Sequence, residues 1–111
     1  MPVEGRSASN STSVIYELGR VIKATPGTLY KITFHNSNIA ARWLQLHDAA
    51  AVPADTAVPT LIYKVGIDTS VTIDFSTIGR YFSTGIVAVS STTGPTKTAS
   101  AADGWFDAQY V

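Results

Sequence analysis

Cysteine is absent from this chain of 111 residues, so a disulfide, a zinc–thiolate site and a thiol nucleophile are excluded. Charge is also scarce: Asp, Glu, Lys and Arg make up 14% of the residues, against about 25% in an average soluble domain. Eight basic and eight acidic residues cancel, and neither sign is clustered. Nucleic-acid binding normally needs a basic stripe, so we expect no DNA or RNA partner. A charge-poor surface favours packing against neighbouring proteins.

Long apolar segments are missing as well. No run approaches the roughly 20 apolar residues of a membrane span, and the N-terminal MPVEGRSASNSTS has no apolar signal segment. We therefore expect neither a membrane partner nor export. The sequence lacks the G-x-x-x-x-G-K-[ST], G-x-G-x-x-G and G-x-S-x-G motifs, and no spacing of carboxylates favours glycoside hydrolysis. We predict no catalytic, cofactor-binding or metal site, and no enzyme activity.

What the chain does contain is a series of short runs rich in β-branched and aromatic residues. Turn signals separate these runs about every 8–12 residues, and no amphipathic helix is present. The pattern predicts an all-β fold, a single small antiparallel β-sandwich or jelly roll of about seven or eight strands. We expect a flexible polar N-terminal arm over 1–12 and one β-sandwich domain over 13–111. The expected strands lie within 13–23, 28–35, 40–48, 60–67, 70–76, 79–91 and 105–111.

Two pairings follow from the short turns. A hairpin is predicted between 28–35 and 40–47 around the Asn-Ser-Asn at 36–38, and a second pair between 60–67 and 70–76. Alternation along the first strand places Tyr30, Ile32 and Phe34 on one face. The segment 49–59 is predicted as a loop because of its prolines, and 92–104 as a long, exposed connection because of its low apolar content.

The stretch HNSNIAARWLQLHD, residues 35–48, contains both histidines of the chain. In the predicted hairpin His35 and His47 lie at opposite ends, about 23 Å apart along the ribbon, too far to share a metal or a proton. Asp48 is adjacent to His47 in sequence and so points to the opposite face of the strand. Both histidines are therefore interpreted as outward strand residues, without an active site.

Outward aromatic residues suggest a partner surface instead. Trp43, Gln45 and His47 share one predicted face of the 40–48 strand, and Trp105 is expected to face outward near the C-terminus. Three interpretations stay open: the 49–59 or 92–104 loop covers this face, another molecule covers it, or the aromatic rings stack on a sugar. Arg42 shares the alternation of Leu44 and Leu46 and is expected at the core edge. There either an acid, such as Asp74 or Asp48, or exposed carbonyl groups would have to meet it.

Several short motifs resemble those of small structural proteins in the virions of tailed bacteriophages. The likeness covers residues 21–111, and no catalytic residue is carried over from it. It consists of a PG-x-LY-x-I-x-x-x-N segment, an AR-x-L-x-L-x-D strand and an F-x-x-GI element. In this sequence these motifs are formed by Pro26, Gly27, Leu29, Tyr30, Ile32 and Asn36, by Ala41, Arg42, Leu44, Leu46 and Asp48, and by Phe82, Gly85 and Ile86.

The resemblance implies a β-sandwich subunit on the exterior of a virion, assembled in the host cytoplasm. We expect a capsid decoration (cement) protein that binds the outside of the assembled phage head, with the major capsid protein or another virion protein as its partner. A homo-oligomer is expected, with a trimer favoured. The alternatives are a tail, fibre or baseplate component of the same virion, and a carbohydrate-binding module that uses Trp43 or Trp105.

Overall fold

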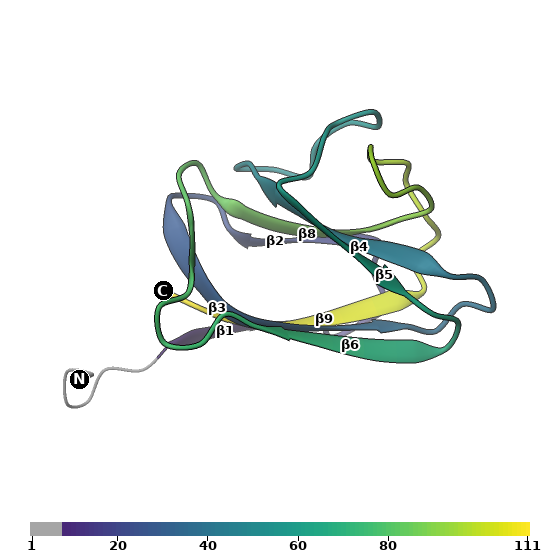
Figure 1. Cartoon of the computed structure of the whole chain (residues 1–111), viewed down its shortest axis with the longest axis horizontal. Helices are drawn as coiled ribbons and strands as arrows, with labels where there is room; N and C mark the ends of the chain where they lie inside the picture. Colours follow the sequence, from purple (N-terminus) through teal and green to yellow (C-terminus); the bar gives the residue numbers. More distant parts are fainter. Residues whose placement is uncertain (1–7) are drawn as a thin grey trace.

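The structure, a computed structural model, describes residues 8–111 of the chain. In this part the chain forms β-strands connected by turns and loops, and contains no helix that is long and apolar enough to cross a membrane (Figure 1). The strands are β1 Ser9–Thr12, β2 Gly19–Lys23, β3 Gly27–Asn36, β4 Arg42–Asp48, β5 Leu61–Val65, β6 Thr69–Asp74, β7 Arg80–Phe82, β8 Ile86–Ser91 and β9 Gly104–Tyr110.

The strands pair in a nested order. β1 pairs with β9, β2 with β8, β3 with both β6 and β7, and β4 with β5, and every pair is antiparallel. The additional pairs β3–β9 and β4–β8 join them into two sheets, which Figure 1 shows as two layers. Sheet A has the order β1-β9-β3-β6 with β7 also on β3, and sheet B has the order β2-β8-β4-β5. This nesting over two sheets is the order of a jelly roll and confirms the predicted fold class.

The core lies between the two sheets. Alternate residues of β3 and β4 point inward, so that Ile32 and Phe34 of sheet A and Leu44 and Leu46 of sheet B have no exposed surface. The Phe34 ring lies 5.0 Å from the ring of Phe106, centroid to centroid. Full burial of each such side chain contributes about 1.5–3 kcal/mol to folding, and this core holds the two sheets together.

Both predicted hairpins are wrong, because the connections cross between the layers. β3 and β4 lie in different sheets, and so do β5 and β6. The 36–41 connection is stabilised by Asn36, whose buried side chain donates from Nδ2 to the carbonyl oxygens of Ala40 at 2.9 Å and Gly66 at 3.0 Å. A short polar connection can therefore cross between the two sheets when a side chain, here that of Asn36, hydrogen-bonds the backbone carbonyl groups of the crossing.

A β-bulge changes the predicted face of β3. The register against β9 shifts between Leu29 and Lys31, so Leu29, Ile32 and Phe34 point inward and Tyr30 is only half-buried. The prediction that Tyr30 shares the face of Ile32 and Phe34 is therefore wrong. An extra residue in one strand reverses the alternation beyond it, which a period-two pattern does not reveal.

The ordered sheet begins before the predicted domain boundary at Ser13. Ser9–Thr12 forms β1, an edge strand that the Thr12 hydroxyl also joins to β9 by donating to Asp107 Oδ1 at 2.8 Å. The segment 13–18, predicted as part of a strand, instead crosses from sheet A to sheet B. The rest of the predicted arm, 1–7, lies outside the described residues. β1 and the short β7 raise the number of strands above the predicted seven or eight.

Candidate interaction surfaces

The outer face of sheet B is covered by its own loops. Trp43, Gln45 and His47 point outward from β4 as predicted, yet Gln45 and His47 are buried. The loops 49–59 and 92–99 lie over this face, and Figure 1 shows both of them standing above sheet B. We call these two loops the cover. Of the three interpretations that the sequence left open, coverage by loops is the one that holds for Gln45 and His47.

Gln45 anchors the cover to the sheet. Its Nε2 donates toward the carbonyl oxygens of Thr93 at 3.0 Å, Gly94 at 2.8 Å and Thr96 at 3.1 Å. Its Oε1 lies 3.1 Å from His47 Nε2, which must donate because an amide oxygen only accepts. The buried Gln45 amide thus satisfies backbone groups that would otherwise be unpaired under the loop.

Trp43 is also held beneath the cover. Gly94 lies flat against its indole, since a Cβ at Gly94 would come within 3.2 Å of three ring atoms. Lys64 Nζ lies 5.8 Å from the ring centroid, close enough for a cation–π contact. Trp43 therefore packs within its own chain, and it is not the open stacking surface that the carbohydrate interpretation needs.

The cover contains a buried cation. Lys97 is only 4% exposed, and its Nζ lies 2.8 Å from Asp55 Oδ1 in the other loop. This hydrogen bond from Lys97 lowers the pKa of Asp55. Backbone bonds join the loops beside it, from Thr56 N to Lys97 O and from Lys97 N to Ala57 O, both 2.8 Å. Burial lowers the pKa of His47, and the Lys97 charge lowers it further, so His47 is held neutral.

The outer face of sheet A carries no such loop in the described part of the chain, and its side chains form cross-strand rows. In one row the Trp105 indole stacks on the His35 imidazole, with centroids 5.5 Å apart and an interplanar angle of 21°. His35 is fixed in turn, since Nδ1 lies 2.8 Å from Ser70 Oγ and Nε2 lies 3.5 Å from Asp68 Oδ1. Trp105 therefore has a defined orientation on an accessible sheet face.

The adjacent row is made of hydroxyl and carboxylate groups. The Thr33 and Thr72 hydroxyls are hydrogen-bonded at 2.9 Å, and Thr33 lies opposite Asp107, which accepts from Thr12. Thr33 and Asp107 are two residues along their strands from His35 and Trp105, so all four side chains lie on the same face of sheet A. The face thus combines one ordered indole with several groups that donate and accept hydrogen bonds.

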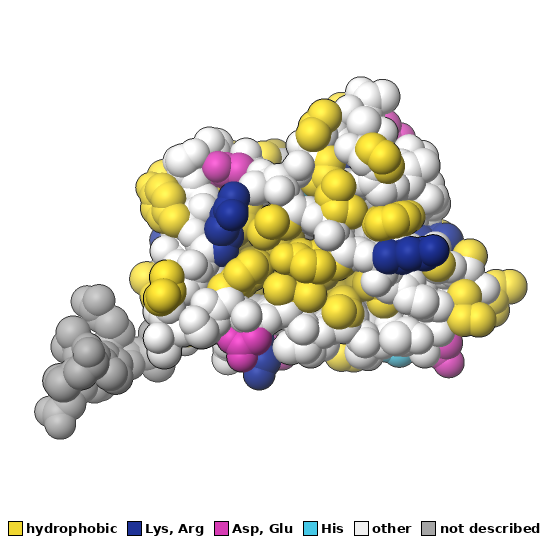
Figure 2. Space-filling model, viewed as in Figure 1, with side chains coloured by type: hydrophobic (Ala, Val, Ile, Leu, Met, Phe, Trp, Pro, Cys, Tyr) yellow, Lys and Arg dark blue, Asp and Glu magenta, His cyan; other side chains and the backbone are white. Residues whose placement is uncertain are grey.

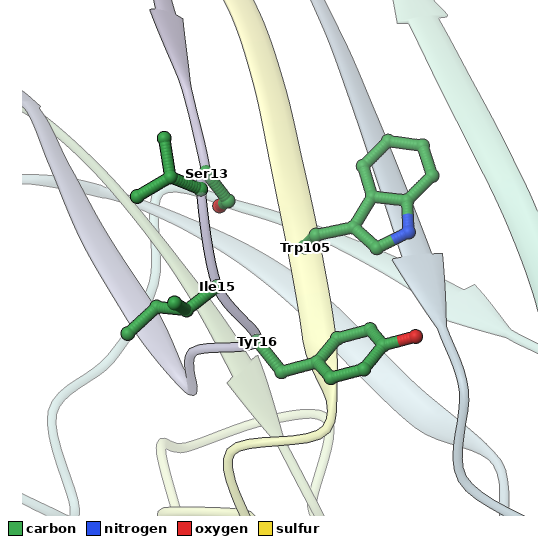
Figure 3. A pocket seen from close by; sticks show the side chains of 5 residues that line it. Ser13, Ile15, Tyr16 and Trp105 are labelled. Atoms are coloured by element: carbon green, nitrogen blue, oxygen red, sulfur yellow. The ribbon is translucent and has the colours of Figure 1, made fainter.

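Next to Trp105 lies a hollow of about 420 Å³, lined by Ser13, Val14, Ile15, Tyr16 and Trp105 (Figure 3). We call it the Trp105 hollow. Tyr16 and Trp105 project on the same side of β9 in Figure 3, and Tyr16 is 54% exposed. The alternation pattern predicted an outward Trp105 but gave no indication of Tyr16. The segment SVIYELG has the composition of a strand, whereas it forms a crossing between the two sheets at 13–18.

A third surface lies where the sandwich is open. β5 and β6 are the edge strands of the two sheets on one side, and among the described residues neither has a strand partner beyond it. Between these two strands, hydrophobic side chains that pack against the core are only partly buried. Figure 2 shows hydrophobic atoms gathered between the two layers. We call this surface the open seam, formed by Leu61 and Tyr63 of β5 and by Val71, Ile73 and Phe75 in and after β6.

The residues considered for chemistry are dispersed. His35 and His47 project from the outer faces of different sheets, and His47 is buried beneath the cover. Asp48 accepts backbone hydrogen bonds from Ser83, Thr84 and Gly85, of which the one from Thr84 lowers its pKa most. No group of three or more His, Cys, Asp or Glu that could hold a metal ion occurs among residues 8–111.

Arg42 does enter the core edge, where its Nη1 donates to the Ala41 carbonyl at 3.2 Å, but neither Asp74 nor Asp48 meets it. Its Nη2 lies 3.8 Å from Asp103 Oδ2, and Asp103 also accepts from Asn38 Nδ2. Asp103 belongs to the 92–104 connection, so the predicted exposed loop supplies the buried partner.

No family model matches this chain, and no curated protein or solved structure matches it either. Among the described residues, three surfaces are therefore the candidates for a functional role: the covered face of sheet B, the face of sheet A with the Trp105 hollow, and the open seam.

Proposed function

We propose that this chain is a non-enzymatic structural protein of a tailed-phage virion, and that it decorates the outside of the assembled head. The motif resemblance at residues 21–111 supports this proposal, together with the low charge content and the jelly-roll order. Jelly rolls occur in viral capsid domains and also in lectins, so the fold alone is an analogy. The observation that carries the proposal is the open seam.

The open seam has the properties of a surface that a neighbouring subunit covers. Two edge strands offer unpaired backbone groups beside half-covered core side chains. Monomeric sandwiches usually protect such edges with charges, prolines or covering loops, and edge pairing between subunits is a common mode of association. We propose that a second copy covers the seam in a small homo-oligomer, with a trimer favoured.

Exposed apolar side chains at one end of the sandwich provide a further contact for the particle. Ile39 is 92% exposed and Ile67 is 59% exposed, and the hydrogen bond from Asp68 N to Asn38 O at 3.1 Å holds their turns together. Exposed isoleucines on two adjoining turns offer apolar surface that a partner could cover. The proposed partner is the major capsid protein or another virion protein.

A decoration protein stabilises a shell by mass action. Because it binds the assembled lattice and not the free subunit, each bound copy shifts the equilibrium toward the assembled state. An oligomer that contacts several sites at once multiplies weak affinities through its effective concentration. No cofactor or catalytic group is needed for this role.

The first test is the copy number of the chain in purified virions, measured by quantitative mass spectrometry against the major capsid protein. We expect hundreds of copies in a simple ratio to the capsid subunit. A handful or a dozen copies would favour a tail, fibre or baseplate component. Absence from the particle would overturn both virion assignments.

The second test uses a matched pair of variants in β6. Val71→Lys places a charge in the open seam, where the lysine stem can reach solvent without unfolding the edge strand. Thr72→Lys adds the same charge on the exposed opposite face. We expect Val71→Lys to dissociate the oligomer in light scattering and to lower particle occupancy, whereas Thr72→Lys changes neither. Equal behaviour of both variants would contradict the seam as the interface.

A further inference from the structure

The Trp105 hollow combines the two properties that a sugar-binding site requires. A pyranose ring has an apolar face of C–H groups and a rim of hydroxyls, so its sites pair an aromatic ring with side chains that donate and accept hydrogen bonds. Trp105 and Tyr16 supply two aromatic rings on one side of β9 (Figure 3). The hollow is shallow and open to solvent, so a ligand would lie against the two rings rather than within an enclosed pocket.

The Trp105 side chain is held in place before any ligand binds. His35 stacks on one face of the indole at 5.5 Å, and the same indole lines the hollow. His35 is itself held by the Ser70 hydroxyl at 2.8 Å. A side chain that is already ordered loses less conformational entropy on binding, so the half-buried Trp105 indole is pre-organised to stack on a flat ligand such as a sugar ring.

Polar groups surround the aromatic pair. The Ser13 hydroxyl at the hollow lies 2.5 Å from Glu17 Oε2, and Asp107 follows Trp105 on the same face of β9, about 7 Å along the strand. Asp107 accepts from Thr12 through Oδ1, and a carboxylate has about four acceptor positions in all. Glu17 and Asp107 can therefore accept hydrogen bonds from sugar hydroxyls.

The local charge selects among sugars. Glu17 is hydrogen-bonded to Ser13, which lines the hollow, and Arg20 is already paired with Glu17 at 3.0 Å. Asp107 lies two residues after Trp105 on β9. Carboxylates repel an acidic sugar and accept from a neutral one. Trp43, which lies under the cover, does not offer an equivalent site.

We propose that the Trp105 hollow binds a neutral saccharide, which stacks on Trp105 and Tyr16 and donates hydroxyl protons to the carboxylates beside them. This site is on a different face from the open seam, and the proposal does not depend on the virion assignment. Binding of a glycan is thus a second property of the chain, beyond its role in assembly.

The experiment uses the full chain and an array of neutral oligosaccharides built from hexoses, pentoses and N-acetylhexosamines, with sialylated oligosaccharides included. We expect saturable binding of neutral members and weaker binding of the sialylated ones. The best neutral oligosaccharide is then titrated by calorimetry. Absence of binding to every neutral member at millimolar concentration would overturn the proposal, and preference for sialylated members would contradict the role of the carboxylates.

Three variants locate the site. Trp105→Ala and Tyr16→Ala should each weaken the measured affinity about fivefold to tenfold, since aromatic stacking contributes about 1–1.4 kcal/mol per ring. Tyr16 is half-exposed on a loop, so its replacement keeps the fold even if that of Trp105 does not. Tyr81→Ala is the control, because this exposed tyrosine pairs opposite Thr28, about 23 Å along β3 from His35.

Fluorescence gives an independent measure of the same site. In a Trp43→Phe background Trp105 is the one remaining tryptophan, and we expect a saturable emission change on addition of the oligosaccharide. Unchanged affinity in both Trp105→Ala and Tyr16→Ala would place any sugar site elsewhere and overturn the proposal. Particle occupancy should be the same for Tyr16→Ala and the parent chain, so failure of one proposal does not imply failure of the other.

Discussion

Replacing Gln45 with methionine tests whether one buried amide holds the cover on sheet B. Methionine fills nearly the same volume but donates no hydrogen bond, so the change isolates the polar contribution. Gln45 Nε2 lies 2.8–3.1 Å from three carbonyl oxygens. Because the amide nitrogen carries two hydrogens, these contacts are equivalent to about two full hydrogen bonds. Each contributes about 1 kcal/mol net, and the carbonyls left buried add to the loss, so we expect a total of about 3 kcal/mol.

A loss of this size should lower the melting temperature by about 10 °C in a domain of this length. Chemical denaturation followed by circular dichroism measures the free energy of unfolding, and hydrogen exchange at the Thr56 and Lys97 amides reports on the cover itself. Gln109→Met is the matched control, since Gln109 is half-buried on the outer face of sheet A and should change stability by less than about 0.5 kcal/mol. A Gln45→Met protein as stable as the Gln109→Met protein, with unchanged amide protection, would refute the anchoring role.

Two further outcomes follow from the same contacts. Because the folded protein holds His47 neutral with a lowered pKa while the unfolded chain takes up a proton near 6.5, the free energy of unfolding should fall as pH drops below about 6.5 toward that lowered pKa. His47→Gln should flatten this part of the pH profile in denaturant titrations, and an identical slope in both proteins would contradict the burial of neutral His47 beside Lys97. A Cβ at Gly85 would lie 2.4 Å from the backbone oxygen of Ala49, so Gly85→Ala should cost about 3 kcal/mol. Gly66→Ala, whose Cβ would meet nothing closer than 3.5 Å, should cost less than about 1 kcal/mol in the same assay.

The strands could be predicted from local pattern, but their partners could not. Alternation and turn residues located β4, β6 and β9 to within a few residues, and the predicted 79–91 segment contains both β7 and β8. Pairing in a jelly roll is non-local: β1 joins β9 from the other end of the chain. A turn such as Asn36–Asn38 suits a hairpin and a crossing equally well, and which one forms depends on the packing of both sheets.

The cover on the outer face of sheet B could not be predicted from local pattern either. Alternation correctly placed Trp43, Gln45 and His47 on the outer face of β4, yet it contains no information about what lies above that face. The 92–104 connection was predicted as exposed because it has few apolar residues. It covers the sheet through polar contacts instead, with Gln45 below its backbone and Lys97 paired to Asp55. Coverage by hydrogen bonds leaves no hydrophobic signal in the sequence.

The positions of the open seam and the Trp105 hollow allow assembly and sugar binding to operate together. In sheet A the order β9-β3-β6 places Trp105 two strands from the seam edge, about 10 Å away, and its side chain points outward from the sheet. A neighbouring subunit that extends the sheet beyond β6 therefore leaves the outer face of β9 accessible. On an assembled head, many copies would then present this face at once, and weak binding by each hollow would add up through multivalency. The array oligosaccharide should accordingly bind chains on the particle as well as free chains, and saturating it should leave particle occupancy unchanged. Competition between the oligosaccharide and the particle would show that the two surfaces overlap and would contradict this arrangement.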